Sequence, residues 1–257
     1  MPQTTTAPRK KTRLMTEGGI FKNLLLFAVP LILGNLLQQL YNTADSIIVG
    51  NFLGSNALAA VGSSGSPIFL LIGFSQGVAV GAGVVVAQYL GAKDREDAQI
   101  AVHTSLAIAA ILGVVLTVGG ILVCHSLLVW MNTPAEVLED AVTYMRIYFG
   151  GVLFSIIYNM AAGILNAAQR SLIYLGCASI TNIILDLVLI AGLRMGVEGA
   201  AIATDISQLV SCILSLRFLM RVEDDYRVTL RKIRPDAKMS ARIIRVGLPT
   251  GIQNMVI

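Results

Sequence analysis

Four polar side chains inside otherwise apolar stretches of this sequence are of the types that bind a small cation. They are Asp45 in the first stretch, Asn182 and Asp186 in the fifth, and Thr204 in the sixth. Carboxylate, amide and hydroxyl oxygens suit a hard cation or a proton, and do not suit zinc. Two carboxylates at one site repel when both are ionised, so we expect one to hold a proton or both to share a cation.

Helical spacing places these polar residues on common faces. Gln38, Tyr41 and Asp45 follow the pattern i, i+3, i+7, and Asn182 and Asp186 follow i, i+4. A carboxylate at the centre of a bilayer costs about 2.5 to 3.5 kcal/mol, so we interpret these faces as lining a functional cavity. The alternative stays open that the Asp residues are interfacial and that Asn and Thr only join packed helices.

The predicted depth of the polar residues is similar in three helices. Asp45 lies six residues from the outer end of its stretch, Asp186 eight and Thr204 six. At about 1.5 Å per residue, all three lie roughly 9 to 12 Å below the outer surface, which predicts a single site. Asp205 points about 100° away from Thr204. Its side chain could face the cavity, a neighbouring helix or the outer interface, and the sequence does not decide between them.

Composition indicates the elements that position this site. Hydrophobic residues make up 55% and charged residues 13% of the 257 residues, and the mean hydropathy is +0.75. These values exclude a water-soluble surface. A bilayer core about 30 Å thick needs roughly 20 apolar residues per helix. Six stretches meet this length: 24–52, 57–90, 100–123, 141–165, 172–193 and 197–220. A seventh begins near residue 243. The sequence predicts an all-α, polytopic membrane protein.

Basic residues predict the orientation of these helices in the cell membrane. With the N-terminus in the cytosol, every Lys and Arg except Arg146 and Arg194 falls on the cytosolic side. We predict a cytosolic tail (1–19), a six-helix lobe (20–220), a basic cytosolic connector (221–242) and the start of a second lobe (243–257). We interpret the connector as a solvated linker, with lipid-headgroup binding as the alternative. The net charge of +4 reflects topology, so we expect no nucleic-acid partner.

An internal repeat relates the two ends of the sequence. Residues 27–35 (FAVPLILGN) recur as residues 246–254 (VGLPTGIQN), and each copy begins a helix after a basic segment. The repeat predicts a second lobe in the same orientation and about twelve helices in all. Pro30 removes a backbone hydrogen bond inside the first helix and predicts either a static kink or a hinge. No nucleotide-binding, catalytic or metal-hydrolase motif is found, so we predict no enzyme and no cofactor.

Four segments occur in the order of a known family. They are QQLYNTAD (38–45) followed by VG (49–50), AQYLGA (87–92), NIILD (182–186) and GAAIAT (199–204). With these segments, residues 17–257 resemble the multidrug and toxic compound extrusion (MATE) transporters. The resemblance implies twelve helices in two six-helix lobes, working as a monomer. It also implies export of organic cations or other amphipathic compounds driven by Na⁺ or H⁺, which stay equal alternatives.

The resemblance also implies roles for individual residues. The family's cation site falls on Asp45, Asn182, Asp186 and Thr204, and its cavity on Gln38, Tyr41 and Asn159. Pro30 matches the proline at which the family's first helix bends. Asp205 occupies a usually apolar position, which we interpret as a further cavity residue that alters ion stoichiometry or selectivity.

Two other functions stay open at this stage. A flippase for lipid-linked or polysaccharide precursors would share the number of helices. It should have a more basic cavity, whereas the apolar stretches here hold almost no Arg or Lys. A membrane scaffold that transports nothing would not need carboxylates at one depth.

Overall fold

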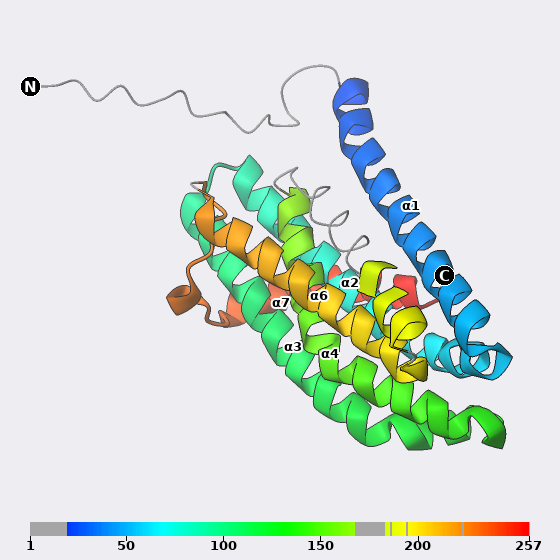
Figure 1. Cartoon of the computed structure of the whole chain (residues 1–257). Coiled ribbons are helices and arrows are strands. Elements are labelled where there is room, and N and C mark those ends of the chain that lie inside the picture. Colours follow the sequence, from blue (N-terminus) through cyan, green and yellow to red (C-terminus); the bar gives the residue numbers. More distant parts are fainter. Residues whose placement is uncertain (1–19, 168–182, 186, 194, 223, 257) are drawn as a thin grey trace, which may run out of the picture.

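The computed structural model describes residues 20–167, 183–185, 187–193, 195–222 and 224–256, which form helices joined by short connections. The helices are α1 (Ile20–Leu53), α2 (Ser55–Gly91), α3 (Arg95–Trp130), α4 (Ala135–Ala167), α6 (Gly196–Arg221) and α7 (Ala237–Val256). A π-helix, η1 (Leu187–Gly192), precedes α6, and a 3₁₀ turn, η2 (Leu230–Lys232), precedes α7. Figure 1 shows a helical bundle with α1 at one edge. The described residues contain no strand, so the all-α prediction is confirmed.

The described helices also confirm a polytopic membrane protein. By length and composition, α2, α3, α4 and α6 can each cross a membrane. Their bounds extend the predicted apolar stretches by a few residues at most ends, because charged and turn residues at the ends are also helical. The predicted tail (1–19) and most of the fifth predicted stretch (172–193) lie outside the described residues.

Three tight turns join the first four helices. Gly54 alone separates α1 from α2 and has a φ of 88°, a conformation that glycine adopts without steric cost. Lys93 (φ 58°) and Asn132 (φ 55°) adopt left-handed conformations after α2 and α3. The Asp94 carboxylate then accepts a hydrogen bond from the Asp97 N–H at 3.2 Å and caps α3. These short turns hold successive helices as antiparallel neighbours.

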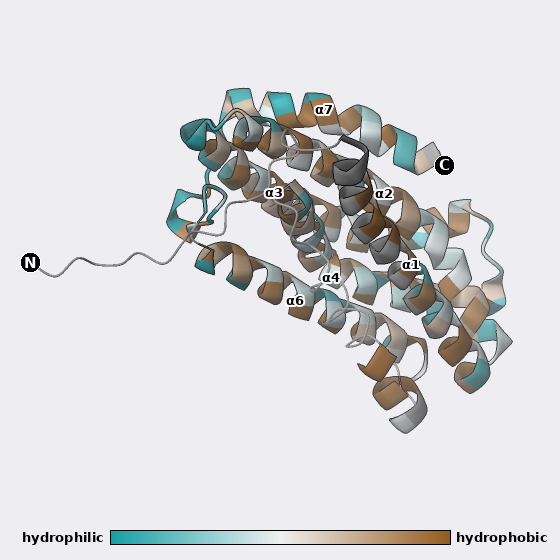
Figure 2. Cartoon of the chain, turned by 90° about the horizontal axis from the view of Figure 1, so that it is seen from above, coloured by the Kyte–Doolittle hydropathy of each residue, from teal (hydrophilic) through white to brown (hydrophobic). Residues whose placement is uncertain are grey.

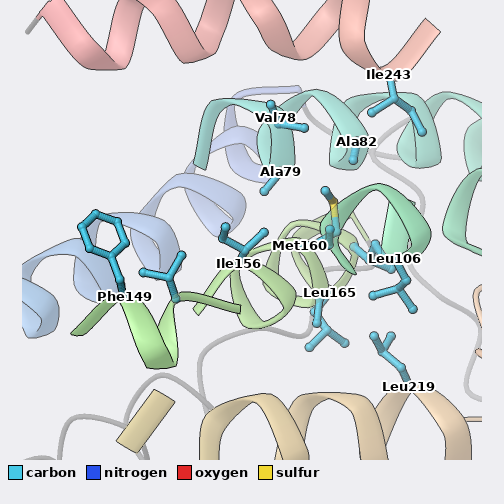
Figure 3. Packing of buried hydrophobic residues seen from close by; sticks show 14 of the residues in the cluster. Val78, Ala79, Ala82, Leu106, Phe149, Ile156, Met160, Leu165, Leu219 and Ile243 are labelled. Atoms are coloured by element: carbon cyan, nitrogen blue, oxygen red, sulfur yellow. The ribbon is translucent and has the colours of Figure 1, made fainter. Parts of the chain in front are cut away.

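The main hydrophobic core lies between α2, α3, α4 and α6 (Figure 3). Its side chains include Val78, Ala82, Leu106, Phe149, Ile156, Met160, Leu165 and Leu219. Small residues bring α2 and α4 close together: a Cβ added at Gly83 would lie 2.7 Å from the Gly163 carbonyl oxygen. Close backbone approach is the usual way that membrane helices gain packing energy.

Helix α7, the predicted start of a second lobe, packs along α2 through glycine. A Cβ added at Gly77 would clash with the Gly251 backbone, and one at Gly81 would clash with the Gly247 backbone. The two glycine pairs therefore allow backbone contact between the helices. Figure 2 shows α7 running alongside α2. Pro249 lies inside α7 without ending it, as expected from the repeat of the Pro30 segment.

An arginine strengthens the contact at the other end of α7. Arg242 donates hydrogen bonds to the Tyr89 hydroxyl at 2.6 Å and to the Gln88 side-chain oxygen at 3.0 Å. Its guanidinium also lies 4.9 Å from the centre of the Tyr89 ring. The AQYLGA segment singled out in the sequence therefore helps to hold α7 in place.

The connector between α6 and α7 packs against the bundle. Tyr226 and Val228 are each only 2% exposed, and Gln99 and His103 of α3 hydrogen-bond its backbone. This segment, interpreted from the sequence as a solvated linker, is thus partly docked on α3, although many of its side chains are exposed. Helix α7 begins at Ala237, several residues before the predicted start, because the Asp236 side chain accepts a hydrogen bond from the Met239 N–H and caps it.

Candidate functional site

A second, smaller hydrophobic cluster joins α1 to α6 at the end of the bundle opposite the connector. It contains Ile48 and Val49 of α1, Ala57 of α2, Tyr144 of α4, Ile190 of η1, and Val197, Ala200 and Ala201 of α6. Alanine and valine dominate it, so the backbones of these elements approach closely. The cluster is the only described place where buried α1 side chains meet the rest of the molecule.

The cluster brings together the helix segments that carry Asp45 and Thr204. Asp45 lies about one helical turn before Val49, and Thr204 about one turn after Ala200. The end of α1 and the start of α6 meet in the cluster, so each residue lies about one turn inward from it along its own helix. The common depth expected from the sequence stays a prediction.

The environments of these two side chains suit cation binding. Asp45 is half-buried, and Thr204 is 5% exposed. The Thr204 hydroxyl donates its hydrogen to the Ala200 carbonyl oxygen at 3.1 Å, within its own helix. Its oxygen lone pairs therefore stay available to accept from, or coordinate, a positively charged group.

The π-helix η1 is the third element at this place. It contacts both α1 and α6, and it begins one residue after Asp186. Its wider turn is seen in the Leu193 N–H, which donates to the Val188 carbonyl oxygen at 2.9 Å, five residues back. Such turns often occur at functional sites because they shift the register of a helix locally. Asn182 and Asp186 themselves lie outside the described residues.

Three other predicted residues lie in α1, and the structure describes only the backbone at these three positions. Gln38, Tyr41 and Pro30 fall within its helical span, and their side chains lie outside the described part of the chain. Figure 1 draws α1 as one continuous helix. Asn159 is half-buried within α4. The cavity and hinge roles of these residues stay predictions.

Asp205 lies against α4. A Cβ added at Gly151 would clash with the Asp205 carboxylate, so the glycine leaves room for this carboxylate against the α4 backbone. Of the three surroundings that the sequence left open, the structure thus places Asp205 at a neighbouring helix. Its partner glycine was not singled out in the sequence, because one glycine among several in an apolar helix carries no specific signal.

Two aromatic residues of α4 were not among the predicted site residues. Tyr144 lies in the cluster between α1 and α6, and its ring stacks on that of Tyr148, with centroids 6.2 Å apart. Their i, i+4 spacing predicts this contact on a helix. An open hollow of about 410 Å³ lies along α2, lined by Gly62, Gly65, Ser66, Phe69 and Leu70. The hollow is lined by both apolar and small residues.

Comparison with known proteins identifies the relatives of this chain. The MatE family model matches residues 30–191. The probable multidrug resistance protein YoeA of Bacillus subtilis (strain 168) is 31% identical over 256 residues, which cover 96% of this chain and 55% of YoeA. The multidrug export protein MepA of Staphylococcus saprophyticus is 28% identical over 245 residues, covering 93% of this chain and 54% of MepA. The chain thus spans about half the length of these relatives.

Solved structures of similar fold agree with this identification. One is the outward-facing conformation of a multidrug resistance MATE family transporter of the MOP superfamily, with a TM-score of 0.88, 32% identity, and coverage of 97% of this chain and 56% of that chain. A MOP superfamily transporter from Pyrococcus furiosus has a TM-score of 0.87 and 33% identity over the same shares. From the family match, the sequence identity and the shared fold, we conclude that the chain belongs to the MatE family of multidrug and toxic compound extrusion (MATE) transporters.

Proposed function

We propose that this chain forms the first lobe of a secondary antiporter in the cell membrane. The antiporter exports organic cations or other amphipathic compounds in exchange for H⁺ or Na⁺. The observation that carries the proposal is the meeting of α1, η1 and α6 in one cluster, with Asp45 and Thr204 each about one turn inward from it. The names of the relatives, which include multidrug export proteins, support the substrate class.

In this proposal the cation site consists of Asp45, Thr204, Asn182 and Asp186. Asp45 supplies a charged oxygen and Thr204 a neutral one, while Asn182 and Asp186 extend the set from the segment that precedes η1. Such a set of oxygens replaces the hydration of Na⁺, and the same carboxylates take up H⁺. Gln38, Tyr41 and Asn159 line the adjacent substrate cavity, and Asp205 adjusts the site from α6.

Coupling then follows from competition within one lobe. Entry of a cation neutralises the carboxylates, which weakens the attraction between the lobe and a positively charged substrate. The same event changes the packing of α1 on η1 and α6, and so shifts the balance between outward- and inward-facing forms. A cation that moves inward supplies about 2.3 kcal/mol per charge per 100 mV of membrane potential, in addition to its concentration gradient.

The orientation belongs to the same proposal. We place the N-terminal tail and the 221–242 connector in the cytosol, and the cluster between α1 and α6 toward the outer side. A second lobe in the same orientation, which begins with α7, completes the cavity of a monomer. The repeat of residues 27–35 in residues 246–254 supports this placement.

Dye uptake by inside-out membrane vesicles tests the proposed function, because export from the cell appears there as uptake. Inside-out vesicles are prepared from cells that express the complete open reading frame encoding this chain. Uptake of a fluorescent cationic dye is then measured under a Na⁺ gradient, under a pH gradient, and with neither. We expect dye accumulation with one of the two gradients and its collapse when the matching ionophore is added.

Control vesicles from cells without the gene set the background. Accumulation equal to this background under both gradients would overturn the antiport proposal for cationic dyes. Accumulation that requires ATP and survives both ionophores would also overturn it, because it would assign the energy source to nucleotide hydrolysis.

A further inference from the structure

Basic side chains gather on the connector between α6 and α7 and on the first turn of α7. Arg231, Lys232, Arg234 and Lys238 are all exposed. Leu230, directly beside them, is 60% exposed although it is a large apolar residue. Cations next to an exposed apolar side chain are typical of segments that lie in the interface of an anionic membrane.

The first half of this connector is fixed to α3. The Gln99 side chain donates hydrogen bonds to the carbonyl oxygens of Asp225 and Arg227, at 2.6 and 3.2 Å. The Thr229 N–H donates to His103 Nε2 at 3.0 Å. His103 is 4% exposed, so this hydrogen bond is shielded from water. The backbone directly before η2 is therefore held in one position.

The second half of the connector is held by the next residue of α3. The Thr104 hydroxyl accepts a hydrogen bond from the Asp236 N–H at 3.3 Å and lies 3.5 Å from the Arg234 carbonyl oxygen, to which it donates. Thr104 itself is fully buried. Because η2 is anchored on both sides, its cations stand at fixed positions beside the first turns of α3, where a flexible linker would spread them.

Two carboxylates beside the basic residues have structural partners. Asp225 forms an ion pair with Arg95, with Oδ1 and Nε 3.3 Å apart, and Asp236 caps α7. In the described ranges of the chain, Arg95 with Asp225 is the only ion pair. Among the described residues, none of the four exposed basic residues forms an ion pair.

The connector directly follows a candidate membrane-spanning helix at one end of the bundle. Helix α6, which is long and apolar enough to cross a membrane, ends at Arg221, and α7 begins at Ala237. Figure 1 shows the connector at the end of the bundle where α3 begins, and Figure 2 shows hydrophilic residues gathered there. A membrane crossed by α6 would place its headgroups near this end of the bundle.

We propose that Arg231, Lys232, Arg234 and Lys238 form a fixed binding site for the phosphate headgroups of anionic phospholipids. The site takes these lipids from the membrane that the bundle spans, with Leu230 entering the region next to the acyl chains. Long basic side chains reach headgroup phosphates while their stems stay on apolar surface. Lipid binding here would hold α6 and α7 at a constant depth, and it does not depend on the exchange of H⁺ or Na⁺.

Tryptophan quenching by brominated lipids tests this site. The complete protein carries Leu230→Trp, with Trp130 and every other Trp replaced by Phe. It is placed in nanodiscs that contain brominated phosphatidylglycerol or brominated phosphatidylcholine at the same mole fraction. We expect roughly three- to five-fold stronger quenching by phosphatidylglycerol, a preference that declines as salt is raised.

Two sets of substitutions separate charge from structure. Replacing the four basic residues by Gln should make the two lipids quench equally, whereas Arg231→Lys with Arg234→Lys should keep the preference. The proposal would be overturned if both lipids quenched equally, or if neither quenched, in the protein with its basic residues intact. A preference that does not decline with salt would overturn it as well, and that result needs no substitution in the basic segment.

Discussion

Thr204 donates its hydroxyl hydrogen to a hydrogen bond within α6, which leaves its oxygen lone pairs available to a ligand. The hydrogen bond to the Ala200 carbonyl oxygen fixes this orientation. In the proposed site, Thr204 therefore acts as a neutral oxygen ligand beside the Asp45 carboxylate. Thr204→Val keeps the shape and removes the oxygen, whereas Thr204→Ser keeps the oxygen.

The two Thr204 variants should differ in their use of the driving ion. Thr204→Val should raise the ion concentration for half-maximal dye transport about ten-fold, since losing an interaction with a charged group costs about 1.5 to 3 kcal/mol. Thr204→Ser should stay near the wild-type value. Dye transport in vesicles at a series of ion concentrations measures this, and equal half-maximal values for both variants would exclude Thr204 as a ligand.

His103 is held in a single neutral tautomer by two hydrogen bonds. Nε2 accepts from the Thr229 N–H at 3.0 Å, so Nδ1 carries the hydrogen and donates to the Gln99 carbonyl oxygen at 2.7 Å. His103→Ala leaves the Thr229 N–H without its acceptor, at a cost of about 1 to 3 kcal/mol. We expect trypsin to cleave beside Arg231 and Lys232 roughly ten times faster in this variant.

His125 provides the matched control for His103. It lies on the same helix and is exposed, so His125→Ala removes no described contact. Limited proteolysis of both variants in detergent compares them directly. Equal cleavage rates in the two variants would mean that His103 does not hold the connector.

Individual residues also show what the sequence could predict. A common level for Asp45 and Thr204 is predicted from helix length and rise per residue. The contact of Asp205 with Gly151 could not be predicted, since it depends on how α4 and α6 are rotated toward each other. The docking of the connector by Gln99 and His103 was missed because polar residues near a helix end are ordinarily solvated.

At the scale of elements, the contact between α2 and α7 depends on glycine. Gly77→Ala places a methyl group against the Gly251 backbone, which cannot give way as a side chain could. Such overpacking costs about 1 to 3 kcal/mol, so the melting temperature of the purified protein should fall. Gly65→Ala on the same helix meets nothing within 4 Å and should stabilise, because alanine favours a helix by up to about 1 kcal/mol over glycine. Thermal unfolding that ranks Gly77→Ala above Gly65→Ala would contradict this packing.

At the turn between α2 and α3, we expect a substitution to raise the unfolding free energy. Lys93 has a φ of 58°, where a side chain costs roughly 1 to 2 kcal/mol. Lys93→Gly should therefore raise the unfolding free energy by about 1 kcal/mol relative to Lys93→Ala, which removes the same charge and keeps the strain. Denaturant unfolding of the two variants measures the difference, and equal stabilities would show that the turn is not strained.

Helix existence and extent were largely predictable from apolar length alone. The π-helix η1 was not, because a shift from four- to five-residue hydrogen bonding has no distinct residue pattern. It follows the segment that carries Asn182 and Asp186, and it contacts α1 and α6. The sequence predicted three helices for the proposed site, and in the structure α1, η1 and α6 meet in one cluster.

At the scale of the whole molecule, the two copies of the repeat lie in helices that pack differently. The first copy lies in α1, whose described buried residues are confined to its last two turns. The second lies in α7, which packs along α2 through Gly77 and Gly81. In the proposed two-lobe transporter, α7 therefore anchors the second lobe to the first, while α1 has room to change its packing around the cation site.

Asp45→Asn tests the central claim that the cation site on α1 couples ion entry to export. The variant keeps the size of the side chain and removes its charge and its proton site. Asp140→Asn is the control, because Asp140 is an exposed carboxylate at the start of α4. Dye transport under the coupling gradient should be lost in Asp45→Asn, at equal protein amount in the membrane, and retained in Asp140→Asn. Full gradient-driven transport by Asp45→Asn would contradict the account.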